Sequence, residues 1–360
     1  MTSQEYMELA LSIAARGRGL TNPNPSVGAV VVAADGTIVG QGHTAPAGGP
    51  HAEVRALDIA GARAKGATLY CTLEPCSHVG RTGPCVVRIV ESGIVKVVAA
   101  VEDPNPLVSG RGVAYLRDRG VEVDVGLCAD AAERLNEGFF TLMHEHRPFV
   151  IMKAALSADG CLAQTPGVQT WFTSEAADHH SHLVRAEVDA IAVGVGTVLI
   201  DDPLLTVRGV ERTRPFSRVV FDRQLRTPPG SRLLSTREAG PVIIVTTASA
   251  AACTDLRGPL EENGAEIEVA ADATLRSALN CLGARQIETL LLEGGADVHL
   301  SAWDEGMVDF VRLYVTPHVV GPGGLKFLEG RGFDETRLIG RREERLGPDV
   351  MIEGYVHGSR

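Results

Sequence analysis

The sequence has little cysteine, few aromatic residues and no excess of positive charge. Seven cysteines among 360 residues are too few, and odd in number, for a disulfide scaffold, and they indicate a reducing compartment. The formal net charge of −11 argues against non-specific binding to nucleic acid, which needs a basic surface. We therefore expect a protein whose partners are small molecules rather than nucleic acid.

Long apolar runs are also missing. No stretch of about 18 apolar residues is present, so we expect no membrane-spanning segment. Acidic residues come early after Met1 and no apolar core region follows them, which argues against a secretory signal. Together with the sparse cysteines, these features predict a cytoplasmic protein.

The first part of the chain predicts a three-layer α/β domain. Apolar residues at helical spacing alternate with short apolar runs, and Asp35-Gly36 between two such runs is a hairpin signal. The predicted elements are a helix at 4–17, strands at 27–33 and 38–42, a helix at 50–63, a strand at 68–72, a helix at 84–93 and a strand at 95–101. A further strand and helix are expected within 110–140.

The second part of the chain predicts another α/β domain. Residues 144–148 have the character of a linker, and a buried strand is expected to follow at 149–153. Further strand-like runs occur at 190–195, 218–222, 242–246, 266–269, 289–293 and 310–315. Helical segments lie between several of these runs, so we expect a sheet covered on both faces. The predicted domains are residues 1–146 and 147–360.

His51, Cys76 and Cys85 are the candidate metal ligands. One imidazole and two thiolates leave a fourth tetrahedral position on Zn²⁺ open for water, as in catalytic zinc sites. Glu53 stands two residues from the histidine and is a candidate general acid/base, the arrangement of zinc deaminases. His78 as a fourth ligand would instead close the site. Cys85 is expected at a helix N-terminus, where the dipole favours the thiolate.

Three polar residues are candidates for contacts to the deaminase substrate. Eight residues separate the two cysteines, against two in the short zinc-deaminase spacing, and this longer loop carries Arg81. Asn24 stands between two prolines before the first strand, where its amide offers a donor and an acceptor group to a pyrimidine edge. Asn105 follows the strand at 95–101, and ligands bind beyond strand ends. The alternatives are turn residues and a solvated arginine.

The second domain lacks a Gly-x-Gly-x-x-Gly fingerprint, but two glycine turns follow its strands. Gly194-Val195-Gly196 and Glu293-Gly294-Gly295 each allow the backbone to approach a phosphate. Arg185 and Arg208 are candidate phosphate ligands, with a solvated surface position as the alternative. Lys153 and Asp201 are candidate proton donors.

Taken together, these motifs resemble the bifunctional deaminase/reductase family of riboflavin biosynthesis. The resemblance covers essentially the whole chain and rests on nine segments, which are 23–28 (Pro-Asn-Pro-Ser-Val-Gly), 51–54 (His-Ala-Glu-Val), 73–78 (Leu-Glu-Pro-Cys-Ser-His), 80–85 (Gly-Arg-Thr-Gly-Pro-Cys), 103–106 (Asp-Pro-Asn-Pro), 171–174 (Trp-Phe-Thr-Ser), 194–198 (Gly-Val-Gly-Thr-Val), 201–208 (Asp-Asp-Pro-Leu-Leu-Thr-Val-Arg) and 293–296 (Glu-Gly-Gly-Ala). The chain departs from the family pattern at Ala158 and Gln169.

The resemblance implies a cytidine-deaminase-like domain followed by a dihydrofolate-reductase-like domain. It implies zinc-dependent deamination of 2,5-diamino-6-(5-phosphoribosylamino)pyrimidin-4(3H)-one, then reduction of the ribosyl chain to ribityl with NADPH. The implied NADPH-binding residues are Ala155, Trp171, Thr197, Asp201, Gly295 and Ala296. The implied reductase substrate residues are Gln169, Arg185, Leu205, Arg208 and Glu293. The partner is thus a small phosphorylated pyrimidine, and we expect a homo-oligomer.

Three other interpretations remain. A guanine or nucleoside deaminase fused to an inactive reductase-like domain is the nearest, but the long loop between the cysteines and the second set of glycine turns disfavour it. A non-enzymatic zinc-stabilised module would have no use for Glu53. A nucleic-acid editing deaminase is disfavoured by the acidic charge balance.

Overall fold

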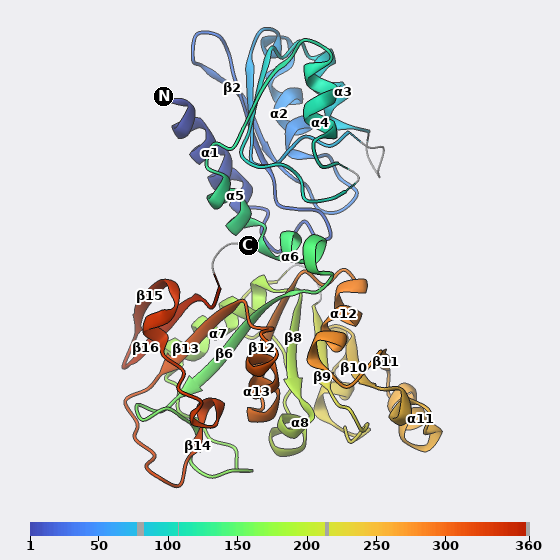
Figure 1. Ribbon diagram of the computed structural model, residues 1–360, viewed down its shortest axis with the longest axis vertical. Coiled ribbons are helices and arrows are strands. Elements are labelled where there is room, and N and C mark those ends of the chain that lie inside the picture. The colour runs from blue at the N-terminus through green and yellow to red at the C-terminus, as the bar shows by residue number, and fades with distance from the viewer. Residues whose placement is uncertain (78–82, 107, 213–215, 358–360) are drawn as a thin grey trace. The chain divides into compact units, whose positions relative to one another are not determined.

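The chain divides into two compact units, Met1–Glu145 and His146–Arg360 (Figure 1). The computed structural model describes residues 1–77, 83–106, 108–212 and 216–357. His78 and Arg81 therefore lie outside the described residues. Within the described part, no helix is both long enough and apolar enough to cross a membrane.

The first unit is built on a five-stranded sheet with the order β2-β1-β3-β4-β5. Its strands are β1 (Gly28–Val32), β2 (Ile38–His43), β3 (Thr68–Cys71), β4 (Lys96–Ala99) and β5 (Glu122–Val125). β1 runs antiparallel to both β2 and β3, whereas β3, β4 and β5 are parallel. The carboxyl ends of β3 and β4 therefore lie at the same edge of the sheet.

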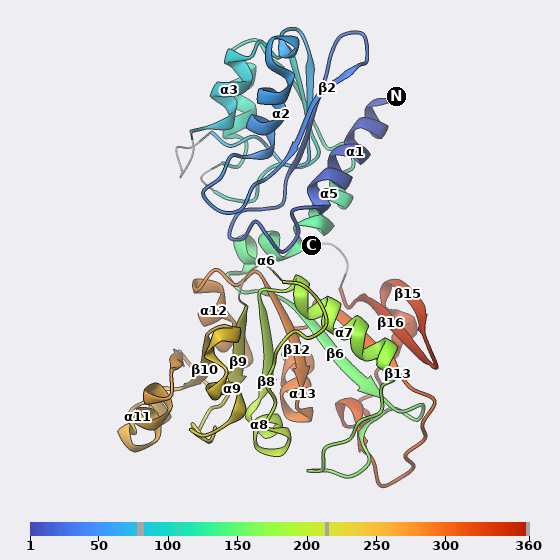
Figure 2. The ribbon, with the colours of Figure 1, turned by 180° about the vertical axis from the view of Figure 1, so that it is seen from behind.

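Helices cover both faces of this sheet (Figures 1 and 2). They are α1 (Ser3–Ala15), α2 (Ala52–Ala60), α3 (Cys85–Glu91), α4 (Arg111–Arg117), α5 (Ala129–Leu135) and α6 (Glu137–Glu145), with a 3₁₀ turn, η1, at Gly61–Ala64. Buried residues of α2, α3 and α4 pack on one face, and those of α1 and α5 pack on the other. The predicted three-layer arrangement is confirmed.

Glycines set how closely the helices approach this sheet. A Cβ atom at Gly28 would lie 2.0 Å from the carbonyl oxygen of Ala10 in α1. On the other face, a Cβ at Gly40 would lie 2.1 Å from the carbonyl oxygen of Ala56 in α2. Side chains at these positions would push the helices away. The position of α2, which begins directly after the candidate ligand His51, thus depends on a glycine in β2.

The second unit contains a nine-stranded sheet with the order β11-β10-β9-β8-β12-β6-β13-β16-β15. Its strands are β6 (Phe149–Leu156), β8 (Ala190–Gly194), β9 (Ser217–Phe221), β10 (Val242–Thr247), β11 (Ala265–Ala270), β12 (Thr289–Gly294), β13 (Phe310–Val315), β15 (Ile339–Leu346) and β16 (Asp349–Tyr355). The strands from β11 to β13 are parallel, and β16 and β15 continue the sheet antiparallel. A separate hairpin pairs β7 (Cys161–Ala163) with β14 (Leu325–Lys326).

Helices also cover both faces of the larger sheet (Figures 1 and 2). They are α7 (Glu175–Glu187), α8 (Val195–Asp201), α9 (Arg232–Ser235), α10 (Ala248–Ala251), α11 (Thr254–Glu262), α12 (Leu275–Ala284) and α13 (Ala296–Asp304), with 3₁₀ turns η2 (Arg237–Ala239), η3 (Phe327–Gly330) and η4 (Glu335–Arg337). Buried residues of α12 and α13 form one core, whereas those of α7, α8, α9 and α11 form the other. This is the predicted sheet with two covered faces.

Two sequence expectations about local structure are wrong. Residues 110–140 begin with a helix, α4, and contain two more helices after β5, because the pattern at 137–145 continues to bury Phe139 and Leu142. For the same reason the residues expected to start a linker at 144 still belong to α6. The sequence analysis also missed β16 and its neighbour β15, which is a mostly exposed, charged edge strand without the apolar run on which strand prediction rests.

Candidate active sites

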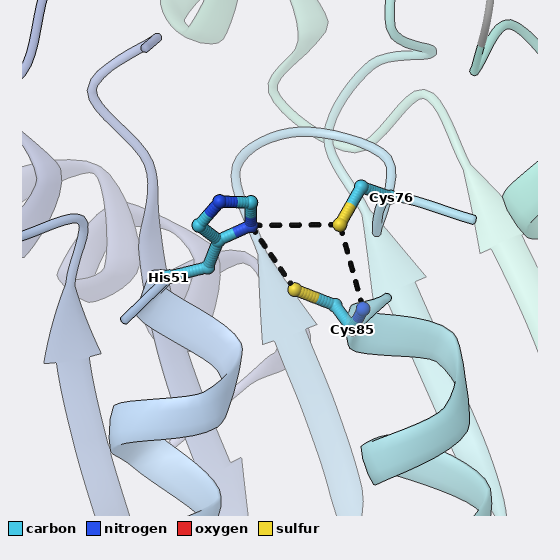
Figure 3. Close-up of side chains that lie close together, drawn as sticks. All are labelled: His51, Cys76 and Cys85. Atoms are coloured by element: carbon cyan, nitrogen blue, oxygen red, sulfur yellow. Dashed lines mark hydrogen bonds between the residues drawn. The ribbon is translucent and has the colours of Figure 1, made fainter. Parts of the chain in front are cut away.

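His51, Cys76 and Cys85 converge in the first unit (Figure 3). His51 is the residue before α2, Cys85 begins α3, and Cys76 lies in the loop after β3. The Nδ1 atom of His51 lies 3.5 Å from the Sγ of Cys76 and 3.3 Å from the Sγ of Cys85. The three donor atoms lie within 4.8 Å of one another, so one nitrogen and two sulfurs fit a single zinc ion with a fourth position open.

A hydrogen bond between the two cysteine sulfurs shifts their pKa values in opposite directions. A hydrogen bond from Cys85 lowers the pKa of Cys76 to about 4, against the effect of burial, and His51 lowers it further. The pKa of Cys85 is raised by the same thiol–thiolate bond and by burial. The backbone N–H of Cys85, at the start of α3, donates to the Sγ of Cys76 at 3.4 Å. The N-terminus of α3, which begins at Cys85, therefore also stabilises a thiolate at Cys76.

Glu53 lies beside this cluster without belonging to it. It is in the first turn of α2 and 4% exposed, and its carboxylate is not among the donor atoms that gather within 4.8 Å. Burial, with the Cys76 charge as a second cause, raises the pKa of Glu53 to about 7. A carboxyl group with such a pKa both accepts and releases protons near neutral pH, as a general acid/base must.

The predicted substrate residues of this unit lie in loops. Asn24 is partly exposed in a turn in which its N–H donates to the carbonyl of Thr21 at 3.0 Å. Asn105 follows β4, and its N–H donates to the carboxylate of Asp103 at 2.8 Å. Burial, together with the charges of Glu74 and Cys76, raises the pKa of Asp103 to about 6. The sequence analysis selected Asn105 from this loop and missed Asp103, which lies within electrostatic range of the metal ligands.

A cavity of about 830 Å³ lies in the second unit, at the carboxyl ends of parallel strands β6, β8, β9, β10 and β12. Its lining includes several of the predicted site residues, namely Ala155, Gln169, Thr197, Asp201, Glu293, Gly295 and Ala296. Gly295 has φ +72, a conformation that favours glycine, and it precedes α13. Trp171, Arg185, Leu205 and Arg208 are not among the described lining residues, and Trp171 is 76% exposed.

Glu293 and Arg185 form an ion pair with two hydrogen bonds. The Nε and Nη2 atoms of Arg185 donate to the two carboxylate oxygens of Glu293 at 2.6 and 2.5 Å, and Nη1 donates to the carbonyl of Thr206 at 2.9 Å. Burial opposes ionisation of Glu293, but the charge and hydrogen bonds of Arg185 lower its pKa to about 2. Of the two predicted phosphate ligands, Arg185 is paired with the carboxylate of Glu293, whereas the side chain of Arg208 is exposed to solvent.

The lining also contains charged and titratable groups that the sequence analysis did not select. Arg223 and Arg226 are exposed cations in the loop after β9. His299 is 1% exposed, and burial lowers its pKa to about 4, so the ring is neutral at pH 7. Lys153, which the sequence did suggest, lies in β6 and has its pKa lowered by burial. Only the tertiary fold brings these residues to one cavity.

Comparison with known proteins identifies the family. Residues 148–352 match the RibD C-terminal domain, and residues 1–101 match the cytidine and deoxycytidylate deaminase zinc-binding region. The chain is 43% identical to the riboflavin biosynthesis protein RibD of Aquifex aeolicus over 351 residues, which is 97% of each chain. The chain belongs to the RibD family. The expected resemblance is thereby confirmed.

Solved RibD structures have the same fold. The RibD of Acinetobacter baumannii matches with a TM-score of 0.86 at 34% identity, over 98% of this chain and 99% of that one. A diaminohydroxyphosphoribosylaminopyrimidine deaminase/5-amino-6-(5-phosphoribosylamino)uracil reductase from Thermotoga maritima matches with a TM-score of 0.82 at 35% identity, over 97% of both chains. These matches confirm a cytidine-deaminase-like domain joined to a RibD reductase domain.

Membership of the RibD family decides between the interpretations of the sequence. The chain is an enzyme of riboflavin biosynthesis with both hydrolase and oxidoreductase activities, rather than a nucleoside deaminase with an inactive second domain. The His/Cys/Cys cluster fits the zinc of the deaminase domain, and the reductase domain implies NADPH.

Proposed function

We propose that this enzyme deaminates 2,5-diamino-6-(5-phosphoribosylamino)pyrimidin-4(3H)-one and then reduces the ribosyl chain of the product to ribityl phosphate with NADPH. The observation that carries this proposal is the pairing of two sites in one chain. One is the His51, Cys76 and Cys85 cluster with Glu53 beside it, and the other is the cavity at the strand ends of the second unit. The reactions are those named for the Thermotoga relative.

In the deaminase domain, assigned to residues 1–146, Glu53 is the proposed proton carrier. His51, Cys76 and Cys85 would hold the zinc, which would supply an acidified water as nucleophile. Glu53 would take one proton from the attacking water and pass it to the ring nitrogen, and it would then carry the second proton of that water to the leaving amine. Its raised pKa, caused by burial, matches both directions of transfer. Asn24 and Asn105 are the proposed contacts to the pyrimidine, together with Arg81, which lies outside the described residues.

In the reductase domain, assigned to residues 147–360, we place NADPH along the cavity. Gly295 and Ala296 lie at the N-terminus of α13, where backbone amides favour phosphate. Ala155, Thr197 and Asp201 line the same cavity. The exposed guanidinium groups of Arg223 and Arg226 stand at the β9 end, where they suit the phosphate on the adenosine ribose. Trp171 remains a proposed contact from the edge of the cavity.

The reductase substrate is proposed to bind at the β6 and β12 end of the cavity. Glu293 of β12 and Lys153 of β6 line it there, Gln169 lines the same cavity, and Lys153 is the proposed donor of a proton to the ribosyl chain as it is reduced. The low pKa of Lys153, caused by burial, makes its ammonium group a better acid than an exposed lysine. Leu205 and Arg208 lie on either side of Thr206, whose carbonyl accepts a hydrogen bond from Arg185. Arg208 itself is exposed, and we propose it as the ligand of the substrate phosphate.

Two further properties belong to this proposal. We infer a homo-oligomer on the family resemblance alone. We also infer a cytoplasmic location, because two of the three metal ligands are thiols that must stay reduced.

The test is a two-stage assay on one purified preparation. The diaminopyrimidine substrate should release ammonia without NADPH, and NADPH oxidation should begin only after deamination. If guanine or nucleosides release ammonia while the phosphoribosyl pyrimidine does not, the proposed substrate is wrong. NADPH oxidation with a separately prepared deaminated substrate examines the second reaction independently.

A further inference from the structure

Glu74 is a buried carboxylate that the proposed reaction does not use. It is 3% exposed and stands two residues before Cys76. Four backbone N–H groups donate to it, two to each oxygen. Oε1 accepts from Gly112 at 2.8 Å and Val113 at 3.1 Å, and Oε2 accepts from Gly110 at 2.9 Å and Asp103 at 3.2 Å.

These four amides come from both ends of one segment. Asp103 opens the loop after β4 that carries Asn105, and residue 107 of this loop lies outside the described part. Gly112 and Val113 lie in the first turn of α4, which closes the loop. The backbone N–H of Glu74 also donates to the carbonyl of Val101 at 2.9 Å. One residue therefore joins the loop with the metal ligand Cys76 to the loop with the proposed substrate contact Asn105.

The contact between the two loops is close as well as polar. A Cβ atom at Gly112 would lie 2.1 Å from the carbonyl oxygen of Pro75 and 3.0 Å from the Oε1 of Glu74. Any side chain at position 112 must therefore push α4 and its loop away from residues 74–76. The separation of the two loops is fixed by direct backbone contact.

A buried carboxylate adds little net stability but demands a defined geometry. Removing a charge from water is costly, and that cost is offset here only while all four amides point at the carboxylate. A glutamine has the same shape but only one acceptor oxygen, so it satisfies one pair of amides and directs its own NH₂ at the other pair. The charge of Glu74 thus requires both ends of the loop to be in place at once.

We propose that Glu74 is a positioning residue of the deaminase, which holds residues 103–106 and the start of α4 at the distance from Cys76 at which Asn105 meets the pyrimidine substrate. This inference rests on the proposed deaminase function. It assigns to Glu74 no contact with substrate or metal. Its loss should therefore weaken substrate binding while the zinc site and Glu53 remain in place.

The test is E74Q with E102Q as its matched control, because Glu102 is an exposed acid in the same loop. In E74Q we expect zinc content and NADPH-dependent reductase activity on deaminated substrate to match wild type. The deaminase KM should rise about tenfold or more, with kcat changed much less, because substrate positioning and not proton transfer is altered. E102Q should leave both constants unchanged.

Other outcomes overturn the proposal. An unchanged KM in E74Q, with an active wild type, refutes the positioning role alone, whereas a wild type that releases no ammonia refutes the proposed function. A fall in kcat at constant KM would make Glu74 a support of the metal site. If E74Q loses zinc, the G112A variant tests the proposal instead, because its added methyl group moves α4 and the preceding loop while the carboxylate of Glu74 is retained. G112A should reproduce the KM increase with zinc retained, and a normal KM in G112A would refute the proposal.

Discussion

Arg185 and Glu293 form a two-point ion pair in the second unit, with Nε and Nη2 of the arginine 2.6 and 2.5 Å from the two carboxylate oxygens. Glu293 lines the cavity, whereas Arg185 is not among its described lining residues. The pair joins α7 to the end of β12, so that the carboxylate at the cavity wall is held ionised and in one orientation.

This pair predicts an acid-sensitive stability. The folded-state pKa of Glu293, about 2, is below its ordinary value of 4.5, because Arg185 outweighs burial. Its contribution is therefore complete above pH 4.5 and is lost as the pH falls towards 2, with an upper limit of roughly 3 kcal/mol. Both tryptophans, Trp171 and Trp303, lie in this unit. Urea unfolding followed by tryptophan fluorescence should show a smaller acid-induced loss in E293Q than in wild type.

The exposed acid Glu187 provides the control for that experiment. E187Q should retain the wild-type dependence on pH. If E293Q loses stability between pH 4.5 and pH 3 as steeply as wild type does, then the ion pair does not set the low pKa.

The metal assignment predicts that C76S removes zinc and deamination together. Cys76 supplies one of the three donor atoms, and a serine hydroxyl is a much poorer zinc ligand than a thiolate. Metal analysis should give one zinc per wild-type chain and almost none for C76S. C128S, at a partly exposed cysteine of the same unit, should keep both zinc and activity. A fully metallated, active C76S enzyme would contradict the assignment.

The role of Glu53 predicts a variant that keeps zinc but not activity. E53Q cannot carry a proton, so deamination should fall by about 10²–10⁴-fold while the metal content stays at the wild-type level. Ammonia release and zinc content should be measured on the same sample. E91Q, at an exposed acid on α3, is the control. A loss of less than tenfold in E53Q would exclude Glu53 as the proton carrier.

Arg208 as phosphate ligand predicts a defect confined to the reductase. A charge-assisted contact to phosphate contributes roughly 1.5–3 kcal/mol, so R208A should raise the reductase KM about tenfold or more. Ammonia release should be unaffected. R345A, which removes an exposed arginine of β15, should behave as wild type. A normal reductase KM in R208A would show that Arg208 is a solvated surface residue without a contact to the substrate phosphate.

If Arg223 and Arg226 bind the additional phosphate of NADPH, they explain a preference of the reductase for NADPH over NADH. If they face the additional phosphate of NADPH, the R223A/R226A variant should have a KM for NADPH raised roughly tenfold or more, and an unchanged KM for NADH. Reductase rates with each dinucleotide measure both constants. An equal rise for both dinucleotides would indicate a general electrostatic effect rather than recognition of that phosphate.

Much of the fold follows from local sequence pattern. The hairpin around Asp35-Gly36, the helix at α2 and the parallel strands of the second unit all match their predicted positions, because each carries its own periodicity or turn residues. The edge strand β15 does not, since its charged residues carry no such signal. Its place in the sheet is set by pairing with β16, which itself pairs with β13.

The sequence by itself determined the candidate metal ligands, because His51, Cys76 and Cys85 combine a rare set of residue types with a diagnostic neighbour in Glu53. Only the tertiary structure decided which other groups act together. Glu74 meets the amides of residues 103–113, Arg185 meets Glu293, and Arg223 reaches the same cavity as Lys153. These contacts join segments far apart in the chain, and their geometry depends on strand order and helix packing, which local residue patterns do not encode.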